Sequence, residues 1–292
     1  MFDLKAYLNR QQARVDAYLK AALPPETTRP AILHKAMAYS VMAGGKRFRP
    51  ILSMAAARAC GRPDDHSLAA GAAIELLHTY TLIHDDLPCM DDDALRRGKP
   101  TCHIVFGEAN ALLAGDALQT LAFEWLASLP AEASPARLAA ELARAAGSQG
   151  VIGGQVEDLL AEGARPSAGR LRYIHNHKTA ALIEAAARLG AIAAGAPEAH
   201  VRKAGRYGLR LGLAFQIADD ILNATSTAEE LGKPVGSDKT RGKMTYVAVH
   251  GLAASRRMAA GLVRQARAEL TALPGDSTPL EALADYVVSR KK

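Results

Sequence analysis

Two aspartate pairs follow apolar residues in separate parts of the chain, and this repeated pattern restricts how the protein can fold. Residues 82–87 read Leu-Ile-His-Asp-Asp-Leu, and residues 216–221 read Gln-Ile-Ala-Asp-Asp-Ile. Paired carboxylates are unfavourable on a buried helix face unless cations neutralise them. We therefore expect both pairs to line sites that also hold basic groups or metal ions.

Helix-length apolar segments make up most of the remaining sequence. Of the 292 residues, 49% are apolar and only 5% are aromatic, and alanine-rich runs such as 69–73 favour helix over strand. Proline, glycine and small polar residues mark the breaks between these segments, and no break resembles a long linker. The breaks lie at 23–30, 61–65, 129–135, 162–169, 195–198, 225–242 and 273–279. The sequence therefore predicts an all-α helical bundle that forms a single domain over residues 1–292.

The formal net charge of +6 comes from basic residues that are spread along the chain. Such an excess fits either a solvated basic surface or cations that face inward to receive an anionic substrate, and it does not indicate a nucleic-acid partner. The three cysteines lack paired metal-ligand spacing, so neither a disulfide framework nor a zinc site is expected, which fits a reducing cytoplasm. The N-terminal stretch 1–23 is amphipathic and carries interspersed charges, so we expect neither a signal peptide nor stable membrane insertion.

The first aspartate pair opens a dense acidic cluster. Its five carboxylates are those of Asp85, Asp86, Asp91, Asp92 and Asp93. Oxygen ligands at this density suit Mg²⁺, which usually keeps several waters and takes further oxygens from substrate phosphates. On an unbroken helix Asp85 and Asp91 would point to different sides, but Pro88 can kink or end the helix and bring them together.

The second acidic cluster needs no such break, because Asp219 and Asn223 lie four residues apart and share one helix face. Either cluster alone could be an exposed acidic helix end. Calcium binding is a further alternative, but the EF-hand pattern with its central glycine and final glutamate is absent from both. Two clusters in matching apolar contexts favour a shared metal and phosphate site.

Basic residues occur in groups that suit phosphate binding. Residues 44–50 read Gly-Gly-Lys-Arg-Phe-Arg-Pro, a glycine-rich turn that carries three cations ahead of a helix. Arg96 and Arg97 follow the first acidic cluster closely enough to face the same pocket, and arginine suits bidentate phosphate contact. His78 lies two helical turns before Asp85 on the same face. A basic turn alone is more often solvent-facing, and a lone histidine on a helix is usually structural, but the alignment of His78 with the acidic residues leaves both a site role and a structural role open.

Further polar residues are uninformative when each is taken alone. They are Lys178, Thr179, Gln216, Lys233 and Lys243. The last two flank a glycine-rich loop after Asp219, where mobile cations could close over a bound anion.

Taken in order, these motifs resemble those of the trans-isoprenyl diphosphate synthases, and especially the bacterial farnesyl diphosphate synthases. The resemblance covers nearly the whole chain. It rests on Gly-Gly-Lys-Arg-Phe-Arg-Pro at 44–50, Asp-Asp-x4-Asp at 85–91, Arg-Arg-Gly at 96–98, Gly-Gly-Gln-x-x-Asp at 153–158, Lys-Thr at 178–179, Phe-Gln-x-x-Asp-Asp at 215–220 and Gly-Lys at 242–243. No single motif is decisive, but the ordered set is specific.

The resemblance implies an isoprenoid-synthase-type bundle around a central cavity, a homodimer, and a site with three Mg²⁺ ions, for which Mn²⁺ can substitute. By matching positions, Asp85 and Asp91 would ligate two ions and Asp219 the third, and Asp86 would belong to the same catalytic motif. The allylic diphosphate would be surrounded by Arg96, Lys178, Thr179, Gln216, Lys233 and Lys243. Isopentenyl diphosphate would be bound by Lys46, Arg49, His78 and Arg97. Metals and cations would then stabilise the departing diphosphate, which suits the absence of an evident Cys or Ser nucleophile constellation.

Product length is a separate expectation, because the growing tail would run along the helix upstream of Asp85. Tyr80 lies five residues before Asp85, about 7.5 Å along the helix axis, and Thr81 follows it. An aromatic residue at this place resembles bacterial farnesyl synthases and predicts a C15 product, whereas the alternative is that Tyr80 is simply part of the core. A geranylgeranyl or geranyl diphosphate synthase is the nearest alternative function.

One departure from the family pattern is Asn223, where relatives usually carry aspartate. Asparagine removes one charge but can still accept hydrogen bonds and hold a metal-bound water, so we expect activity with weaker occupancy of the third ion. A non-catalytic subunit that modulates another synthase is an alternative from a different class. A class I terpene cyclase would use an acidic motif without needing the second set of cations at Lys46, Arg49 and Arg97.

Overall fold

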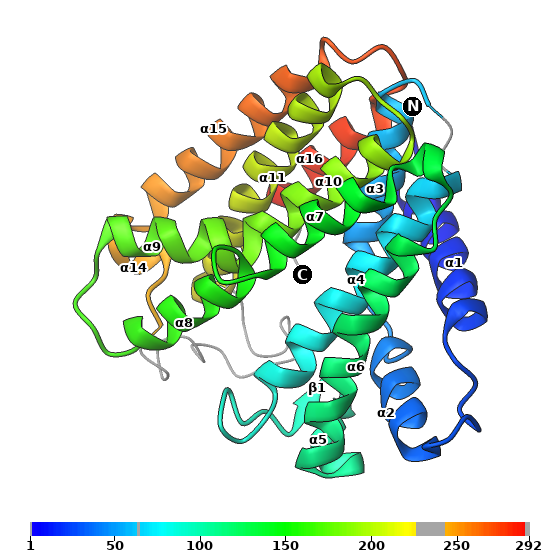
Figure 1. Cartoon of the computed structure of the whole chain (residues 1–292). Helices are drawn as coiled ribbons and strands as arrows, with labels where there is room; N and C mark the ends of the chain where they lie inside the picture. The colour runs from blue at the N-terminus through cyan, green and yellow to red at the C-terminus, as the bar shows by residue number, and fades with distance from the viewer. Residues whose placement is uncertain (1, 63–64, 226–242, 290–292) are drawn as a thin grey trace.

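The computed structural model describes residues 2–62, 65–225 and 243–289, and the described chain is almost entirely helical (Figure 1). The first half contains α1 (Leu4–Ala22), α2 (Ala31–Val41), α3 (Phe48–Ala59), α4 (Asp65–Asp85), α5 (Cys102–Phe106) and α6 (Glu108–Ala127). The second half contains η1 (Ala131–Ala133), α7 (Pro135–Ala146), α8 (Val151–Ala161), α9 (Ala168–Ile174), η2 (His175–Ala180), α10 (Ala181–Ala193), α11 (Glu198–Thr225), α14 (Tyr246–His250), α15 (Leu252–Leu270) and α16 (Thr278–Ser289). The predicted all-α class is confirmed. Within the described ranges, strand structure is limited to β1 (Leu95–Arg96) and β2 (Lys99–Pro100), which pair antiparallel.

Local sequence explains several helix ends. The Asp3 carboxylate accepts a hydrogen bond from the backbone N–H of Ala6 and caps the start of α1. Pro135 begins α7, where its missing N–H costs no hydrogen bond. Helix α4 ends at Asp85, three residues before Pro88, because proline has no N–H to continue the helical ladder.

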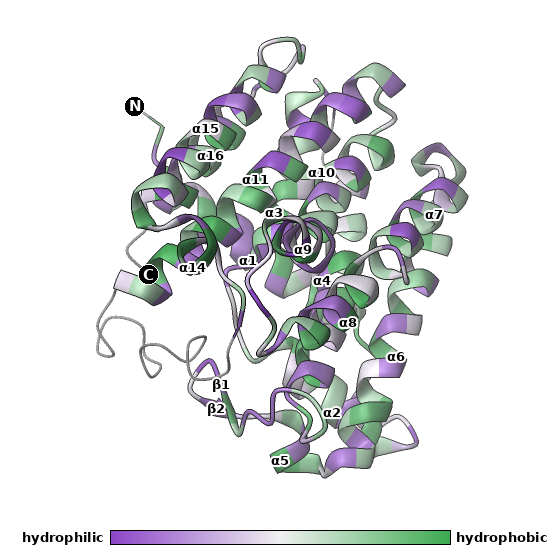
Figure 2. Ribbon diagram, turned by 90° about the vertical axis from the view of Figure 1, so that its left-hand side faces the viewer, coloured by the Kyte–Doolittle hydropathy of each residue, from purple (hydrophilic) through white to green (hydrophobic). Residues whose placement is uncertain are grey.

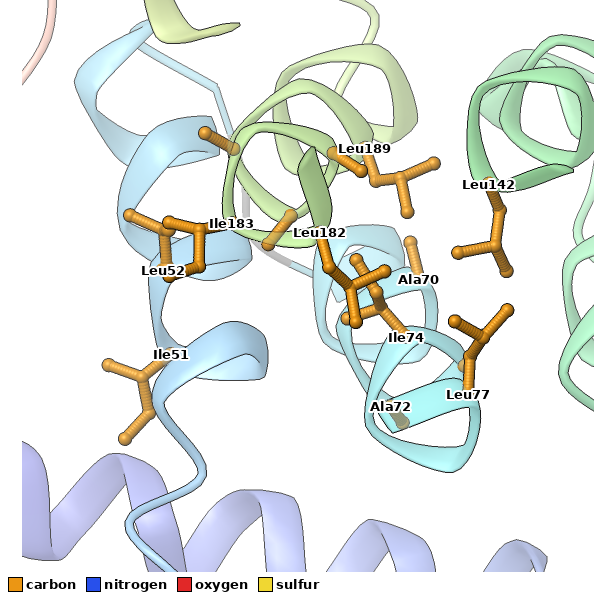
Figure 3. Packing of buried hydrophobic residues seen from close by; sticks show 14 of the residues in the cluster. Ile51, Leu52, Ala70, Ala72, Ile74, Leu77, Leu142, Leu182, Ile183 and Leu189 are labelled. Atoms are coloured by element: carbon orange, nitrogen blue, oxygen red, sulfur yellow. The ribbon is translucent and has the colours of Figure 1, made fainter. Parts of the chain in front are cut away.

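The core is built around α10, which packs against α3, α4, α7 and α11. Figure 3 shows Leu182, Ile183 and Leu189 of α10 beside buried side chains of α3, α4 and α7. Close approach of α10 to α3 requires Gly190, since a Cβ there would lie 1.9 Å from the carbonyl oxygen of Ser53. Fully burying each large aliphatic side chain contributes about 1.5–3 kcal/mol relative to leaving it exposed, so this apolar packing fixes α10 firmly in the middle of the bundle.

Hydropathy along the outer helices agrees with this arrangement. Figure 2 shows hydrophilic and hydrophobic residues alternating along α7 and α15, as expected for helices that cover a core. Helix α7 buries Leu138 and Leu142, while α15 buries Val263 and Leu270. Across the described part of the chain, no helix combines the length and apolar character that a membrane crossing requires.

Helices α4 and α11 carry the two aspartate motifs. Both pack against α10, and each carries its aspartates near its C-terminal end. The central helix therefore holds the two acidic clusters in a fixed relation to each other.

Candidate active site

A tight turn brings together the two ends of the first acidic motif. Beyond the end of α4, the backbone N–H of Asp91 donates to the carbonyl oxygen of Asp85 at 2.8 Å. The chain thus reverses around Pro88, as the sequence predicted. Burial raises the pKa of Asp85 to about 6, and the nearby Asp91 carboxylate acts in the same direction, whereas Lys178 opposes the shift. A carboxylate in this position favours a cation beside it.

Asp86 points away from this turn toward Arg96. Its buried carboxylate accepts hydrogen bonds from Arg96 Nε at 2.7 and 2.9 Å, and Arg96 Nη2 lies 2.6 Å from Oδ1. Arg96 Nη2 also lies 3.6 Å from Asp93. The two predicted site residues Asp86 and Arg96 are therefore partners of each other here, and together they tie the β1 strand to the end of α4.

The second acidic motif lines a cavity of about 330 Å³ between α11 and η2. Asp219 and Asn223 both line it, as their spacing predicted, and so do Lys178, Thr179, Gln216 and Lys243. Its other lining residues are Asp158, Ile174, His175, Asp220, Met244 and Thr245. Lys178 and Thr179 belong to the π-helical turn η2, a distortion that often marks functional sites.

Two lysines connect the acidic clusters. Lys178 Nζ lies 2.5 Å from Asp158 Oδ2, and the charge of Lys178 also reaches Asp85 and Asp91. Lys243 Nζ lies 3.4 Å from Asp91 Oδ1 while lining the cavity of the second motif. Lys233, the other predicted loop cation, lies outside the described residues.

Asp220 has a different role from its neighbour Asp219. Its buried carboxylate accepts hydrogen bonds from Gln216 Nε2 at 3.0 Å and from the backbone N–H of Tyr246 at 2.7 Å. Gln216 Oε1 in turn accepts from the Thr179 hydroxyl at 2.8 Å. Asp220 therefore links α11, η2 and the start of α14 through Gln216, Thr179 and Tyr246.

The predicted diphosphate-binding cations gather in a separate cavity of about 700 Å³. Lys46, Arg49, His78 and Arg97 all line it, although they come from three separate parts of the chain. Burial lowers the pKa of Arg49 to about 10, and the Nε atom of Arg49 is buried with no hydrogen-bond partner among the described residues. Desolvation, together with Arg49 and Arg97, holds the pKa of His78 well below its usual range. This cavity therefore suits an anion.

Arg47, between the two predicted cations of the glycine-rich turn, is structural. It has left-handed backbone angles, with φ of 48°, and only 3% of it is exposed. Its guanidinium contacts Asp16 Oδ1 at 2.7 Å and Glu75 Oε1 at 3.1 Å. Gly45 is favoured beside it because its φ of 128° is a backbone conformation that other residues rarely adopt.

A third cavity, of about 470 Å³, is mainly apolar and extends from Asp85 between α4, α6, α8 and η2. Tyr80 and Thr81, the predicted length-determining residues, both line it, and Tyr80 is 5% exposed. The hydroxyl of Thr81 donates to the carbonyl oxygen of His78. The apolar walls are formed by Leu82, Leu87, Met90, Leu112, Val151, Ile152, Val156, Leu159 and Leu182.

The acidic residues fit a magnesium site that is completed by a ligand. Among the residues the structure describes, no group of three or more His, Cys, Asp or Glu side chains converges as a cage for a metal ion. Asp85 and Asp91 nevertheless meet at one turn, and the Lys178 and Lys243 ammonium groups lie near their carboxylates. Mg²⁺ is usually bound by one or two carboxylates plus substrate phosphates and water, and the donor set here suits that mode.

Sequence reasoning did not identify some residues of this site. Asp158 was noticed within a motif but was not assigned a role, although it holds Lys178. Glu75 and Tyr286 line the basic cavity and His175 lines the acidic one, but the sequence alone does not identify them, because each is an isolated residue in a helical segment. A buried acid such as Glu75, which is 3% exposed, becomes informative only when its partner Arg47 is known.

Known proteins share both this sequence and this fold. Residues 30–272 match the model of the polyprenyl synthetase family. A chloroplastic geranylgeranyl pyrophosphate synthase 12 of Arabidopsis thaliana is 46% identical over 99% of this chain and 82% of its own length. The crystal structure of an FPP/GFPP synthase from Zymomonas mobilis has a TM-score of 0.86 and 36% identity, and the match covers 98% of this chain and 99% of that chain. A geranylgeranyl pyrophosphate synthetase from Pyrococcus horikoshii has a TM-score of 0.89 and 30% identity, over 98% and 99% of the two chains. The chain therefore belongs to the polyprenyl synthetase family of prenyltransferases.

Proposed function

We propose that this prenyltransferase condenses isopentenyl diphosphate with dimethylallyl or geranyl diphosphate and releases (2E,6E)-farnesyl diphosphate. The observation that carries this proposal is that the three cavities share residues. Lys178 and Thr179 line both the acidic and the apolar cavity. Arg49 and His78 line both the basic and the apolar cavity, and Asp219 lines both the basic and the acidic one. Such a site suits two diphosphate groups, one in the acidic and one in the basic cavity, beside a hydrocarbon tail in the apolar cavity.

Each part of the site has a distinct task in this proposal. Asp85, Asp91 and Asp219 would hold Mg²⁺, with three ions expected per site, and Lys178 would add positive charge beside the allylic diphosphate. Bound Mg²⁺ supplies Lewis-acid stabilisation of the departing diphosphate. Lys46, Arg49 and Arg97 bind the second diphosphate, isopentenyl diphosphate, whose double bond attacks the allylic carbon. The new carbocation then loses a proton to the departed diphosphate, which gives the lengthened allylic product. The apolar walls exclude water from the carbocation, which would otherwise be hydrolysed.

Tyr80 supports the C15 product. Its side chain lines the same cavity as Asp85 and lies about one and a half helical turns before Asp85 on α4, where it would limit the space for a growing tail. Because similar proteins are named geranylgeranyl synthases, a C20 product is the second candidate. Tyr80→Ala should lengthen the product, and His66→Ala, at the other end of α4, serves as the control. An unchanged product length after Tyr80→Ala would contradict the assignment of Tyr80 as the floor.

We also propose a homodimer. Exposed apolar side chains occur on α5, α6 and α8, namely Ile104, Val105, Leu112, Leu113, Ile152, Val156, Leu159 and Leu160. Four of them line the apolar cavity at its edge, namely Leu112, Ile152, Val156 and Leu159. Exposed apolar patches often mark protein interfaces, and a second copy would cover these side chains beside the cavity. Sedimentation of the wild type and of Leu113→Lys would test this, with a monomeric wild type as the contradicting result.

The decisive experiment is turnover by the purified protein with Mg²⁺, isopentenyl diphosphate and dimethylallyl diphosphate, followed by chromatographic sizing of the products. A farnesyl product that disappears with EDTA and returns with Mg²⁺ or Mn²⁺ is expected. Mainly geranylgeranyl diphosphate would contradict the proposed length but leave the reaction class intact. No turnover would favour the alternative of a modulatory subunit.

A further inference from the structure

The wall of the apolar cavity contains a second ring beside Tyr80. His84 lies one helical turn after Tyr80 on α4 and immediately before Asp85. Both side chains line the same cavity. The side chain of His84 is 24% exposed, so its ring forms part of the cavity wall between α4 and α6.

The ring of His84 lies directly on the backbone of α6. A Cβ at Gly115 would lie 2.2 Å from His84 Nε2 and 2.5 Å from Cδ2, well inside contact distance. The carbonyl oxygen of Leu112 lies 3.0 Å from His84 Nε2. Because a carbonyl oxygen can only accept, Nε2 carries the hydrogen and donates it. Gly115 is thus required for His84 to occupy this place.

On its other side, His84 supports Tyr80. The two ring centroids are 5.4 Å apart and their planes are inclined at 81°, the edge-to-face arrangement that aromatic rings prefer. The ring of His84 therefore contacts the backbone of α6 at Gly115 on one side and the ring of Tyr80 on the other. Tyr80 cannot move toward Gly115, because His84 fills that space.

We infer that His84 is a positioning residue that sets product length by holding the Tyr80 ring across the cavity floor, and that Gly115 provides the space for it. This inference rests on the proposed function, in which Tyr80 limits the growing chain. Replacing His84 with a small side chain leaves room beside α6 for the Tyr80 ring to rotate, and the cavity deepens although Tyr80 is still present.

The test compares products of the wild type, His84→Ala, Tyr80→Ala and the double variant at equal substrate conversion. His84→Ala should raise the ratio of geranylgeranyl to farnesyl product at least about tenfold, the lower range of discrimination by small changes in an apolar pocket. His84→Gln, whose longer side chain can place an amide N–H donor near the position of Nε2 for Leu112 but lacks the ring, is the second variant if His84→Ala does not fold, and it should shift products in the same direction. His66→Ala, at the opposite end of α4, is the matched control and should keep the wild-type distribution.

The double variant separates an indirect from a direct effect. If His84 acts through Tyr80, the Tyr80→Ala/His84→Ala products should be no longer than those of Tyr80→Ala. Longer products in the double variant, or an unchanged distribution in both His84 variants, would overturn the inference. If Tyr80→Ala itself does not lengthen the product, the proposal that Tyr80 limits product length is wrong. This result is distinguishable from a failure of the inference about His84. A general loss of turnover with unchanged product ratios would show that His84 serves only the fold or Asp85.

Discussion

Arg47 Nη1 donates to Glu75 Oε1 at 3.1 Å in the wall of the cationic cavity, which Lys46 and Arg49 also line. Both members of the pair are nearly inaccessible to solvent, at 2% and 4% side-chain exposure. Within one glycine-rich turn, the chain thus uses one cation to hold the loop and two others to receive an anion.

Arg47→Met should destabilise the fold because it leaves Glu75 buried without its partner. Breaking a buried ion pair typically costs about 3–5 kcal/mol, and urea unfolding should show a loss of that order. Lys46→Met is the matched comparison, since Lys46 is exposed. It should raise the Michaelis constant for isopentenyl diphosphate with little change in unfolding. Equal stability of the two variants would contradict the structural role of Arg47.

Asp91→Asn should lower kcat by at least about 100-fold, the magnitude seen when a group that stabilises transition-state charge is removed. Asp92→Asn is the control, because Asp92 is exposed and its φ of 52° suits asparagine. Steady-state kinetics at saturating Mg²⁺ would compare them. The role of Asp91 would be refuted if both variants lost activity equally.

Asn223→Asp should reduce the Mg²⁺ concentration needed for half-maximal activity. Asn223 lines the same cavity as Asp219, and a carboxylate there would add one negative charge to an oxygen-rich site. Titration of activity with Mg²⁺ would measure the change. The same requirement in both proteins would mean that Asn223 does not limit metal binding.

The buried histidines His78 and His175 should lose their contribution to stability as the pH drops below about 6.5, the ordinary pKa of histidine, whereas the raised pKa of Asp85 acts in the opposite direction below about pH 6. Burial lowers the pKa of His175 to about 4, with Asp158 opposing and Lys178 reinforcing the shift, and His78 is shifted in the same direction. A depressed histidine pKa means that, as the pH falls, the unfolded chain binds the proton before the folded chain does. The contribution of each histidine to stability is therefore fully present above about pH 6.5 and is lost toward pH 4. Each histidine contributes at most about 1.4 kcal/mol per pH unit in this window.

His175→Phe should therefore flatten the acid side of the stability profile. The ring is buried beside Tyr246, with centroids 5.0 Å apart, and phenylalanine keeps an apolar ring there without a titrating group. Urea unfolding at pH 7 and pH 5 would compare the variant with the wild type. An equally steep loss of stability in both proteins would count against His175.

Much of the site was predictable because its motifs are local. The turn that joins Asp85 to Asp91 follows from Pro88, which cannot continue a helix. Asp219 and Asn223 line one cavity because their spacing is close to one helical turn. The grouping of Lys46, Arg49, His78 and Arg97 came from the family resemblance, since nothing in their spacing places α3, α4 and the β1–β2 turn side by side.

The partners of neighbouring charged residues could not be predicted. Successive residues on a helix point about 100° apart, given 3.6 residues per turn. Asp219 therefore lines both the basic and the acidic cavity, while Asp220, in the wall of the acidic cavity, accepts a hydrogen bond from the backbone N–H of Tyr246. The same change of direction separates Asp85 from Asp86, which binds Arg96. A buried aspartate is stable only with such donors, and those donors come from distant segments.

The sequence by itself determined the helical class, the acidic and basic chemistry and the spacing of the two aspartate motifs, because helix periodicity and charge are properties of short segments. Only the tertiary structure decided which charges face the cavities and which serve the fold. Packing of α10 against α4 and α11 brings together side chains that are distant in the sequence. A buried charge is costly without a partner, so each one either pairs with an opposite charge of the protein or lies where a ligand or metal ion can supply it.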